Sequence, residues 1–191
     1  AAEILDIPEY GPVEVSIVDA ANPLVFVRAR DLGLSGTELP SELDSNLQLL
    51  DLLERIRGMA AYRLGLISDY RQSAWLTPGI PKMTLVAEAA GWVTPDGSRM
   101  GQDEADLIGR MMSMQKTHPT YALTGAMCTA AAAAVPGSIV SRVLPSNVNL
   151  HALRIGHPCG VLTVGVEYEP GEKEPEIQYT LAYRTANLLM D

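Results

Sequence analysis

The sequence predicts an α+β fold, in which a curled, mainly antiparallel β-sheet surrounds a central buried helix and a long amphipathic helix lies outside it. Two observations carry this prediction. The last third of the chain contains short β-rich segments divided by Pro, Gly and Asn clusters, and residues 125–135 form an uncharged, Ala-rich segment that would fold as a buried helix. The chain has 191 residues, enough for one well-packed domain and too few for two of full size. Residues 1–191 are therefore predicted to form a single domain.

Charge and composition exclude several kinds of partner. The chain carries 14 Lys and Arg against 23 Asp and Glu, a formal charge of -9, which repels nucleic acid and anionic lipid surfaces. It contains no apolar stretch long enough to span a membrane, and only two cysteines. We therefore expect a reduced, cytoplasmic protein with no nucleic-acid partner and no membrane partner.

The first third of the chain predicts two strands and a helix. Alternation over residues 13–18 and an apolar run over residues 24–27 predict strands, joined by a turn at Asn22-Pro23. Ser41 is the predicted N-cap of the helix, and Asp44 is its reciprocal capping acid. Apolar residues at helical spacing then predict one continuous helix to about residue 65. The charged face of this helix is expected to be solvated, and it includes Glu54, Arg55 and Arg57.

The remaining sheet is predicted from six segments. Residues 82–87 predict a strand after a Pro-Gly-Ile-Pro turn. Residues 105–114 fit either a helix begun by Asp103 and Glu104 or an alternating strand, and we favour the strand. Near the C-terminus, four short segments predict antiparallel strands, at residues 138–144, 151–155, 161–168 and 177–183.

The predicted buried helix is the most informative segment. From Gly125 to Val135 it has high helix propensity and no charged residue, and it ends at Pro136-Gly137. Its small side chains let other backbone segments approach on every side, as a helix within a curled sheet requires. Unpaired N–H groups at its N-terminus, beside Thr124 and Gly125, are suited to a carboxylate. The alternative is that Thr124 only caps the helix.

Two further segments carry candidate site residues. His157 and Cys159 lie in a turn bracketed by Gly and Pro that would present them to a cleft, or would hold a small buried thiol. Lys116 and His118 would contact an anion or lie in a solvated loop. The His and Cys spacing does not suit zinc, and we find no nucleophile elbow, phosphate loop or dinucleotide fingerprint. The residues alone thus predict a soluble α+β domain with a carboxylate site at a buried helix end.

Six segments then form an ordered set of motifs, at residues 15–27, 31–39, 57–65, 113–118, 124–126 and 154–160. In this order they resemble the second half of the 2-methylaconitate cis–trans isomerase (PrpF) family, and the likeness runs from about Glu3 to the last residues. Several unlike motifs in register are more specific than any one of them. The resemblance implies a diaminopimelate epimerase-like fold, with two pseudo-symmetric domains that are each a curled sheet around a central helix.

The resemblance also implies a function. Members of the family isomerise unsaturated di- or tricarboxylic acids by proton transfer, with no metal and no organic cofactor. They are roughly twice as long as this chain, so the N-terminal domain, which carries the Lys and Cys expected to transfer protons, is absent from this sequence. This chain would be the C-terminal domain, inactive alone, with the N-terminal domain of the same protein as its partner. Its exposed surface would also allow a homo-oligomer.

Motif matching further implies which residues face the small-molecule acid. No catalytic residue is assigned to this chain, and where related epimerases carry a Cys before the Thr-Gly-Ala turn it has Ala122. Cys159 stands where many members have Ser and is expected to be a small hydrogen-bonding group. The expected substrate-binding residues are Asn22, Thr124, Gly125, Ala126 and His157, followed by Cys159, Met114 and His118. The alternative function is a non-catalytic carboxylate-binding or assembly domain.

Overall fold

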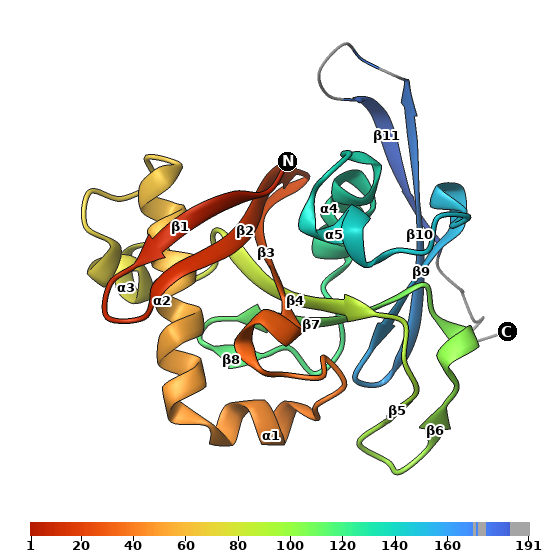
Figure 1. Ribbon diagram of the computed structural model, residues 1–191, viewed down its shortest axis with the longest axis horizontal. Helices are drawn as coiled ribbons and strands as arrows, with labels where there is room; N and C mark the ends of the chain where they lie inside the picture. Colours follow the sequence, from red (N-terminus) through yellow and green to blue (C-terminus); the bar gives the residue numbers. More distant parts are fainter. Residues whose placement is uncertain (170, 172–174, 184–191) are drawn as a thin grey trace, which may run out of the picture.

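One large mixed sheet organises the molecule. The computed structural model describes residues 1–169, 171 and 175–183, and its main sheet has the strand order β1-β2-β3-β4-β7-β9-β10-β11, with β8 paired to β7 (Figure 1). The strands are β1 (Glu3–Ile7), β2 (Gly11–Ala20), β3 (Asn22–Arg28), β4 (Lys82–Glu88), β7 (Leu107–Ser113), β8 (Lys116–Thr117), β9 (Leu153–His157), β10 (Gly160–Glu169) and β11 (Glu176–Ala182). A separate hairpin joins β5 (Trp92–Val93) to β6 (Arg99–Met100).

The pairing is mainly antiparallel, as predicted. Only β3 with β4 and β7 with β9 run parallel among the described strands. The segment at residues 105–114, for which a strand was favoured over a helix, forms the strand β7, and nearly all residues of this strand are buried. Burial on both faces explains why alternation was weak there. The first strand, β1, was not predicted.

The helix α4 (Leu123–Ala134) lies inside the curl of the sheet. It contacts β2 and β3 in one half of the strand order and β10 and β11 at the other end, and Figure 1 shows it between these two groups of strands. Tyr121, just before the helix, packs on Gly109 of β7, where a Cβ would come within 2.6 Å of its ring. The predicted curled sheet around a buried helix is therefore confirmed, although the helix begins at Leu123 and ends at Ala134.

The outer face of the sheet is covered by helices α1 (Pro40–Ser45) and α2 (Leu47–Arg63), and the short helix α3 (Ser73–Leu76) packs on α2. One continuous helix was predicted here, and this was wrong, because Asn46 leaves the helical conformation and its side-chain oxygen caps α2 by accepting from Leu49 N–H at 3.1 Å. The predicted cap at Ser41 was also wrong. Pro40 takes the first helical position, so the N-cap is Leu39, whose N–H donates to the Glu42 carboxylate at 2.7 Å.

Two further local predictions are corrected by the structure. Residues 138–144, predicted as a strand, form the short helix α5 (Ile139–Val143), because Ser138 caps it by accepting from Ser141 N–H at 3.0 Å. The turn between β2 and β3 is made by Ala21, at φ 66°, rather than by Asn22-Pro23, which already belong to β3.

Single-turn 3₁₀ helices complete the fold, at Ala29–Leu32, Tyr70–Gln72, Gln102–Glu104 and Leu150–Ala152. Within the described part of the chain, no helix is both long and apolar enough to cross a bilayer. The strands predicted at residues 151–155, 161–168 and 177–183 correspond to β9, β10 and β11. The first of them begins two residues later than predicted, because His151 and Ala152 belong to a 3₁₀ turn.

Candidate functional site

The first turn of α4 lacks a capping side chain. The N-cap is Ala122, which has no side-chain oxygen, and the first intrahelical bond runs from Ala126 N–H to the Ala122 carbonyl at 2.9 Å. Thr124 is exposed on the second helical residue, so the prediction that it only caps the helix is wrong. The N–H groups of Leu123, Thr124 and Gly125 precede the first intrahelical bond, and the helix dipole makes this end favourable for an anion.

Close packing fixes this helix end against the sheet. A Cβ at Gly125 would overlap the Met111 side chain of β7 and come within 3.7 Å of Leu24 of β3. Ala126 is fully buried in the same cluster of side chains as Leu24 and Met111. Gly125 and Ala126 therefore hold the position of the helix end, and Thr124 is the exposed side chain of this turn.

A row of polar residues crosses the sheet beside that turn. Leu24 of β3 pairs with Lys82 of β4, and Lys82 Nζ donates to Ser113 Oγ of β7 at 3.2 Å. Side chains alternate along a strand, so Lys82 lies on the same face as Val86, and Ser113 on the same face as Met111, both of which pack around α4. Asn22, two residues before Leu24, is on this face as well.

A second group of candidates adjoins the chain that leads into α4. His118 N–H donates to the Met111 carbonyl at 2.7 Å, and His118 Nδ1 accepts from Thr120 N–H at 3.1 Å. Across from them, Cys159 Sγ donates to the Pro119 carbonyl at 3.1 Å. The thiol of the β9–β10 turn thus holds the segment that precedes α4, and Cys159 is exposed rather than buried.

His157 is neutral over most of the pH range. Its pKa is lowered to about 4 by burial first, and then by the nearby positive charges of Arg110 and His118. Its Nδ1 accepts from Cys159 N–H at 3.2 Å, so the proton of the neutral ring is on Nε2. His118, which also accepts at Nδ1, has the same tautomer when neutral. Both rings consequently offer an Nε2–H donor.

Arg110 is a buried charge that sequence reasoning missed. It is fully buried on β7, with Nε donating to the Glu38 carbonyl at 2.7 Å and Nη1 to the Gly109 carbonyl at 3.0 Å, while Nη2 has no hydrogen-bond partner among the residues that the structure describes. Burial lowers its pKa to about 10, an effect that Glu38 and Cys159 partly offset. Its positive charge helps to keep His157 neutral.

Met114 is more peripheral. It lies in the tight turn between β7 and β8 at φ 52°, with 66% of its surface exposed. It follows Ser113 directly, at the edge where Lys82 and Ser113 meet. Lys116 is exposed on β8. Among the described residues, no group of three or more His, Cys, Asp and Glu side chains is placed to hold a metal ion.

The structure thus brings most of the predicted residues to one end of α4, with Met114 at the periphery. Met111 connects them, because its carbonyl binds His118 and its side chain packs at Gly125. Lys82, Ser113 and Arg110 were not predicted. Both Lys82 and Arg110 are cations within mainly apolar strands. A cation buried in this way needs a partner or a ligand, and this requirement could have singled out the two residues. The substrate-facing roles of the eight predicted residues stay predictions.

Known proteins resemble the chain over almost its whole length. It is 36% identical over 182 residues to a 3-methylitaconate isomerase of Eubacterium barkeri, covering 95% of this chain and 47% of that protein. It is 31% identical over 187 residues to a 2-methyl-aconitate isomerase of Cupriavidus necator, covering 98% and 47%. A crystal structure of a methylitaconate-delta-isomerase superposes with a TM-score of 0.85 at 35% identity, covering 96% of this chain and 48% of that one.

The chain therefore spans about half the length of the relatives it matches. The fold, the order of the motifs and the isomerase relatives agree with one another. The family described as PrpF protein matches residues 1–191. Since that match extends over the whole sequence, the chain belongs to the PrpF protein family.

Proposed function

We propose that this chain forms one wall of the cleft of a cofactor-independent isomerase, whose substrates are unsaturated di- or tricarboxylic acids. The observation that carries the proposal is the uncapped first turn of α4, held beside Asn22, Lys82 and Ser113 on one face of the sheet. Its N–H groups and dipole suit a carboxylate. The relatives that the chain resembles include isomerases of 3-methylitaconate, a dicarboxylate, and of 2-methyl-aconitate, a tricarboxylate.

The proposed reaction moves a double bond without any redox change. A base removes a proton from a saturated carbon next to the double bond, and the electron pair of that C–H bond delocalises into a dienolate. A proton then returns to another carbon of the conjugated system, so atoms and electrons balance. Negative charge develops on the substrate carboxylate in the dienolate, and fixed donors at that carboxylate lower the barrier.

In this division of labour, the described residues bind and stabilise charge. Thr124 and the first-turn N–H groups of α4 hold the conjugated carboxylate, while Asn22 and the Nε2–H donors of His118 and His157 contact neighbouring oxygens. Cys159 and Met114 shape the wall. Proton transfer is assigned to a Lys and a Cys in an N-terminal domain of the complete protein.

The same proposal covers partners and location. The N-terminal domain would close the cleft over the α4 end, and the complete protein would work in the cytoplasm. Apolar side chains exposed on α3, at the other face of the sheet, support contact with a second copy of the chain, since Trp75 is 79% exposed and Leu76 62% exposed.

The test is turnover by the complete protein in heavy water. The expected result is that 2-methylaconitate or 3-methylitaconate isomerises with one solvent deuteron incorporated per turnover, detected by proton NMR, and that residues 1–191 alone give no turnover. Turnover by residues 1–191 alone would contradict the division of labour. Carboxylate binding by the complete protein with no turnover of any unsaturated acid would favour the alternative, a non-catalytic carboxylate-binding domain.

A further inference from the structure

We propose that Lys82, held by Ser113, is the anchor for a second carboxylate of the ligand and so selects di- and tricarboxylic acids over monocarboxylic ones. The proposal rests on the proposed function, because it assumes that a first carboxylate binds at the start of α4. It adds a specificity determinant that lies on a different element, β4, and uses a side-chain charge instead of backbone donors.

Lys82 has no carboxylate partner among the residues that the structure describes. The acidic chain pairs its arginines widely, with Arg28, Arg30 and Arg142 each bound to Glu or Asp. Lys82 makes no such pair and donates only to the neutral Ser113 hydroxyl. An ammonium has three N–H donors, so the remaining two are available to a carboxylate. A partly buried cation that lacks a counter-charge favours an anionic ligand.

The position of Lys82 is fixed in advance. The preceding loop is held by Arg57, whose Nη1 donates to the Thr77 carbonyl at 2.6 Å and to the carbonyls of Ile80 and Pro81 at 3.4 Å each. Glu54 in turn binds Arg57 through two hydrogen bonds of 2.6 and 2.8 Å. This ion pair therefore anchors the backbone at the start of β4, and the hydrogen bond to Ser113 orients the Lys82 ammonium before a ligand binds.

The distance to the first carboxylate site suits a short ligand. Lys82 lies between Leu24 and the strand that carries Ser113, and neighbouring strands are about 4.8 Å apart. Leu24 and Met111 are the residues on which Gly125 of α4 packs. The ammonium binds Ser113, which lies two residues, or about 7 Å, from Met111 along β7, so a single small acid with two carboxylates can reach both sites.

The experiment compares lysine variants of the complete protein. Lys82→Met removes the charge with little change in volume, Lys82→Arg keeps the charge, and Ser113→Ala removes the hydroxyl that orients the ammonium. Lys116→Met is the matched control, because it deletes the same charge from an exposed position on β8, a strand that pairs with β7 and not with β4. Each variant is assayed for KM and kcat with a tricarboxylate substrate. In parallel, binding of the saturated tricarboxylate tricarballylate and of the monocarboxylate butyrate is measured by calorimetry.

We expect Lys82→Met to raise KM for the tricarboxylate, and the Kd of tricarballylate, by about 10- to 100-fold, the usual value of a hydrogen bond to a charged group. The change in kcat should be smaller. Lys82→Arg should recover part of the loss, Ser113→Ala should weaken binding by less than Lys82→Met, and Lys116→Met should behave like the wild type. Butyrate binding should not respond to any of these substitutions.

Two outcomes would overturn the inference. The first is tricarballylate binding that Lys82→Met leaves unchanged, and the second is an equal loss in Lys82→Met and Lys116→Met, which would indicate only the overall charge. A wild-type protein that binds tricarballylate through Lys82 but isomerises no unsaturated acid would refute the proposed function and leave this anchor intact. If Lys82→Met does not fold, judged by circular dichroism, Lys82→Gln and Ser113→Ala carry the same test.

Discussion

His157 shows how one residue is tuned by its surroundings. The ring is partly buried beside Arg110 and His118, and its pKa is lowered to about 4 from the ordinary value of 6.5. It therefore remains neutral at pH 7 and keeps the tautomer that accepts from Cys159 N–H. A donor at Nε2 would then be present throughout the physiological pH range.

This depressed pKa predicts a loss of stability in acid. Between pH 6.5 and 4 the unfolded chain binds the proton and the folded chain does not, so the stabilising contribution is complete above pH 6.5 and is lost as the pH falls towards 4. We expect the free energy of unfolding, from urea titrations at pH 7.5 and pH 5, to fall less in His157→Asn than in the wild type. His151→Asn removes an imidazole that is 62% exposed and should retain the wild-type decrease. Equal decreases in all three proteins would contradict the assignment.

The candidate site was only partly predictable at this scale. Thr124, Gly125 and His157 stand in recognisable motifs, and each lies near one end of α4. Lys82 and Ser113 belong to no motif with obvious chemistry. They meet because β4 and β7 are adjacent antiparallel strands, 31 residues apart in the chain, and this pairing is not encoded in either segment alone.

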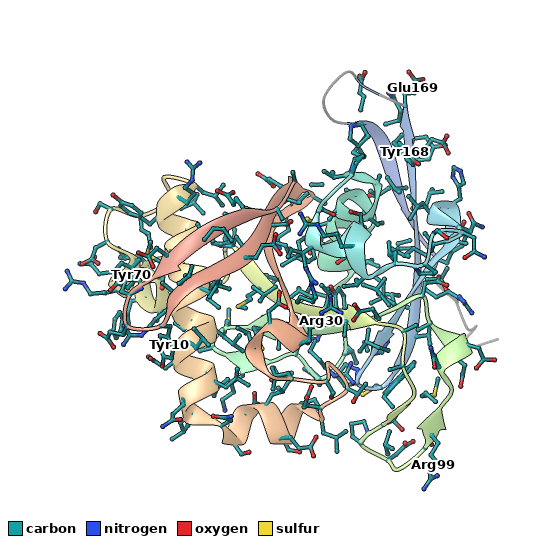
Figure 2. All side chains as sticks on the ribbon, in the orientation of Figure 1. Tyr10, Arg30, Tyr70, Arg99, Tyr168 and Glu169 are labelled. Carbon is teal, nitrogen blue, oxygen red and sulfur yellow. The ribbon has the colours of Figure 1, made fainter. Side chains whose placement is uncertain are left out.

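At the scale of elements, α2 places two arginines in opposite environments. Both were expected to be solvated, which is wrong for the buried Arg57 and only partly right for Arg55. The side chain of Arg55 is 25% exposed and pairs with Asp51 at 2.8 Å. Its guanidinium carbon lies 5.8 Å from the centre of the Tyr10 ring, and Figure 2 labels Tyr10 beside α2. Arg57 is 4% exposed and holds the loop before β4. The helical periodicity of α2 did not predict that Arg57 is buried, because the loop that covers Arg57 packs on α2 only in the folded chain.

This contrast predicts unequal costs for two similar substitutions. Arg57→Met leaves loop carbonyls and Glu54 without their buried partner, so we expect the free energy of unfolding to fall by about 3 kcal/mol. Arg55→Met removes a surface pair and should cost less than about 1 kcal/mol. Urea denaturation of the two variants measures both values. Similar losses in the two would show that Arg57 does not hold the loop.

The helix α5 shows why a β-rich sequence is not enough to make a strand. Its residues Ile139, Val140 and Val143 are buried on the side that faces the sheet, a spacing that suits one face of a helix. β-branched residues had favoured a strand on propensity. The Ser138 cap and burial against α4 outweigh that preference, which is small for each residue.

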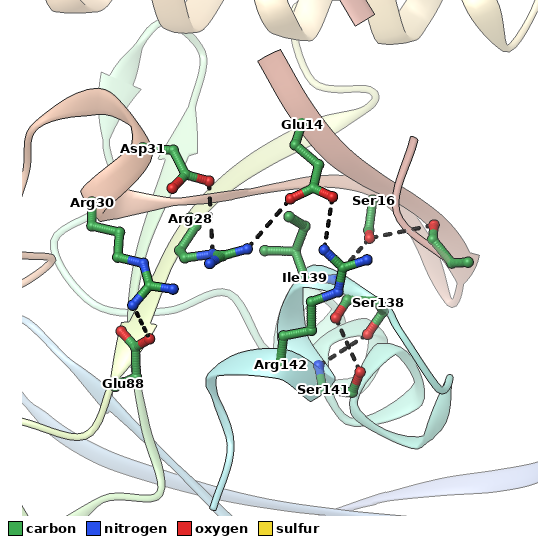
Figure 3. A network of polar contacts seen from close by, with 11 residues as sticks. Glu14, Ser16, Arg28, Arg30, Asp31, Glu88, Ser138, Ile139, Ser141 and Arg142 are labelled. Carbon is green, nitrogen blue, oxygen red and sulfur yellow. Dashed lines mark hydrogen bonds and ion pairs between the residues drawn. The ribbon is translucent and has the colours of Figure 1, made fainter. Parts of the chain in front are cut away.

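For the whole molecule, a polar network ties the N-terminal strands to α5 (Figure 3). Glu14 of β2 accepts from Arg28 of β3 at 3.3 Å and from Arg142 of α5 at 2.7 Å. Beneath it, the fully buried Ser16 hydroxyl accepts from Ile139 N–H at 2.9 Å, a contact between residues 123 positions apart. These contacts hold α5, which packs on α4, against the N-terminal strands.

The long-range bond predicts a stability effect at a position far from the candidate site. Ser16→Ala leaves the buried Ile139 N–H unpaired, so we expect the free energy of unfolding to fall by about 2 kcal/mol. Ser45→Ala is the matched control, because its exposed hydroxyl donates only to the Glu42 carbonyl at 2.8 Å, and it should change stability by less than about 0.5 kcal/mol. Thermal or urea unfolding of the two variants measures both changes. If Ser16→Ala leaves the free energy of unfolding unchanged, another group must accept the hydrogen bond from Ile139 N–H.

The sequence by itself determined the fold class, the buried helix, most of the strands and the family, because alternation, uncharged helical segments and ordered motifs are local properties of the chain. Only the tertiary structure decided that residues 139–143 are helical, that Arg57 is buried, and that Lys82 and Ser113 lie beside the end of α4. The reason is physical. These features depend on strand register and on packing between distant segments, and that free energy exists only when the whole sheet has curled around the helix.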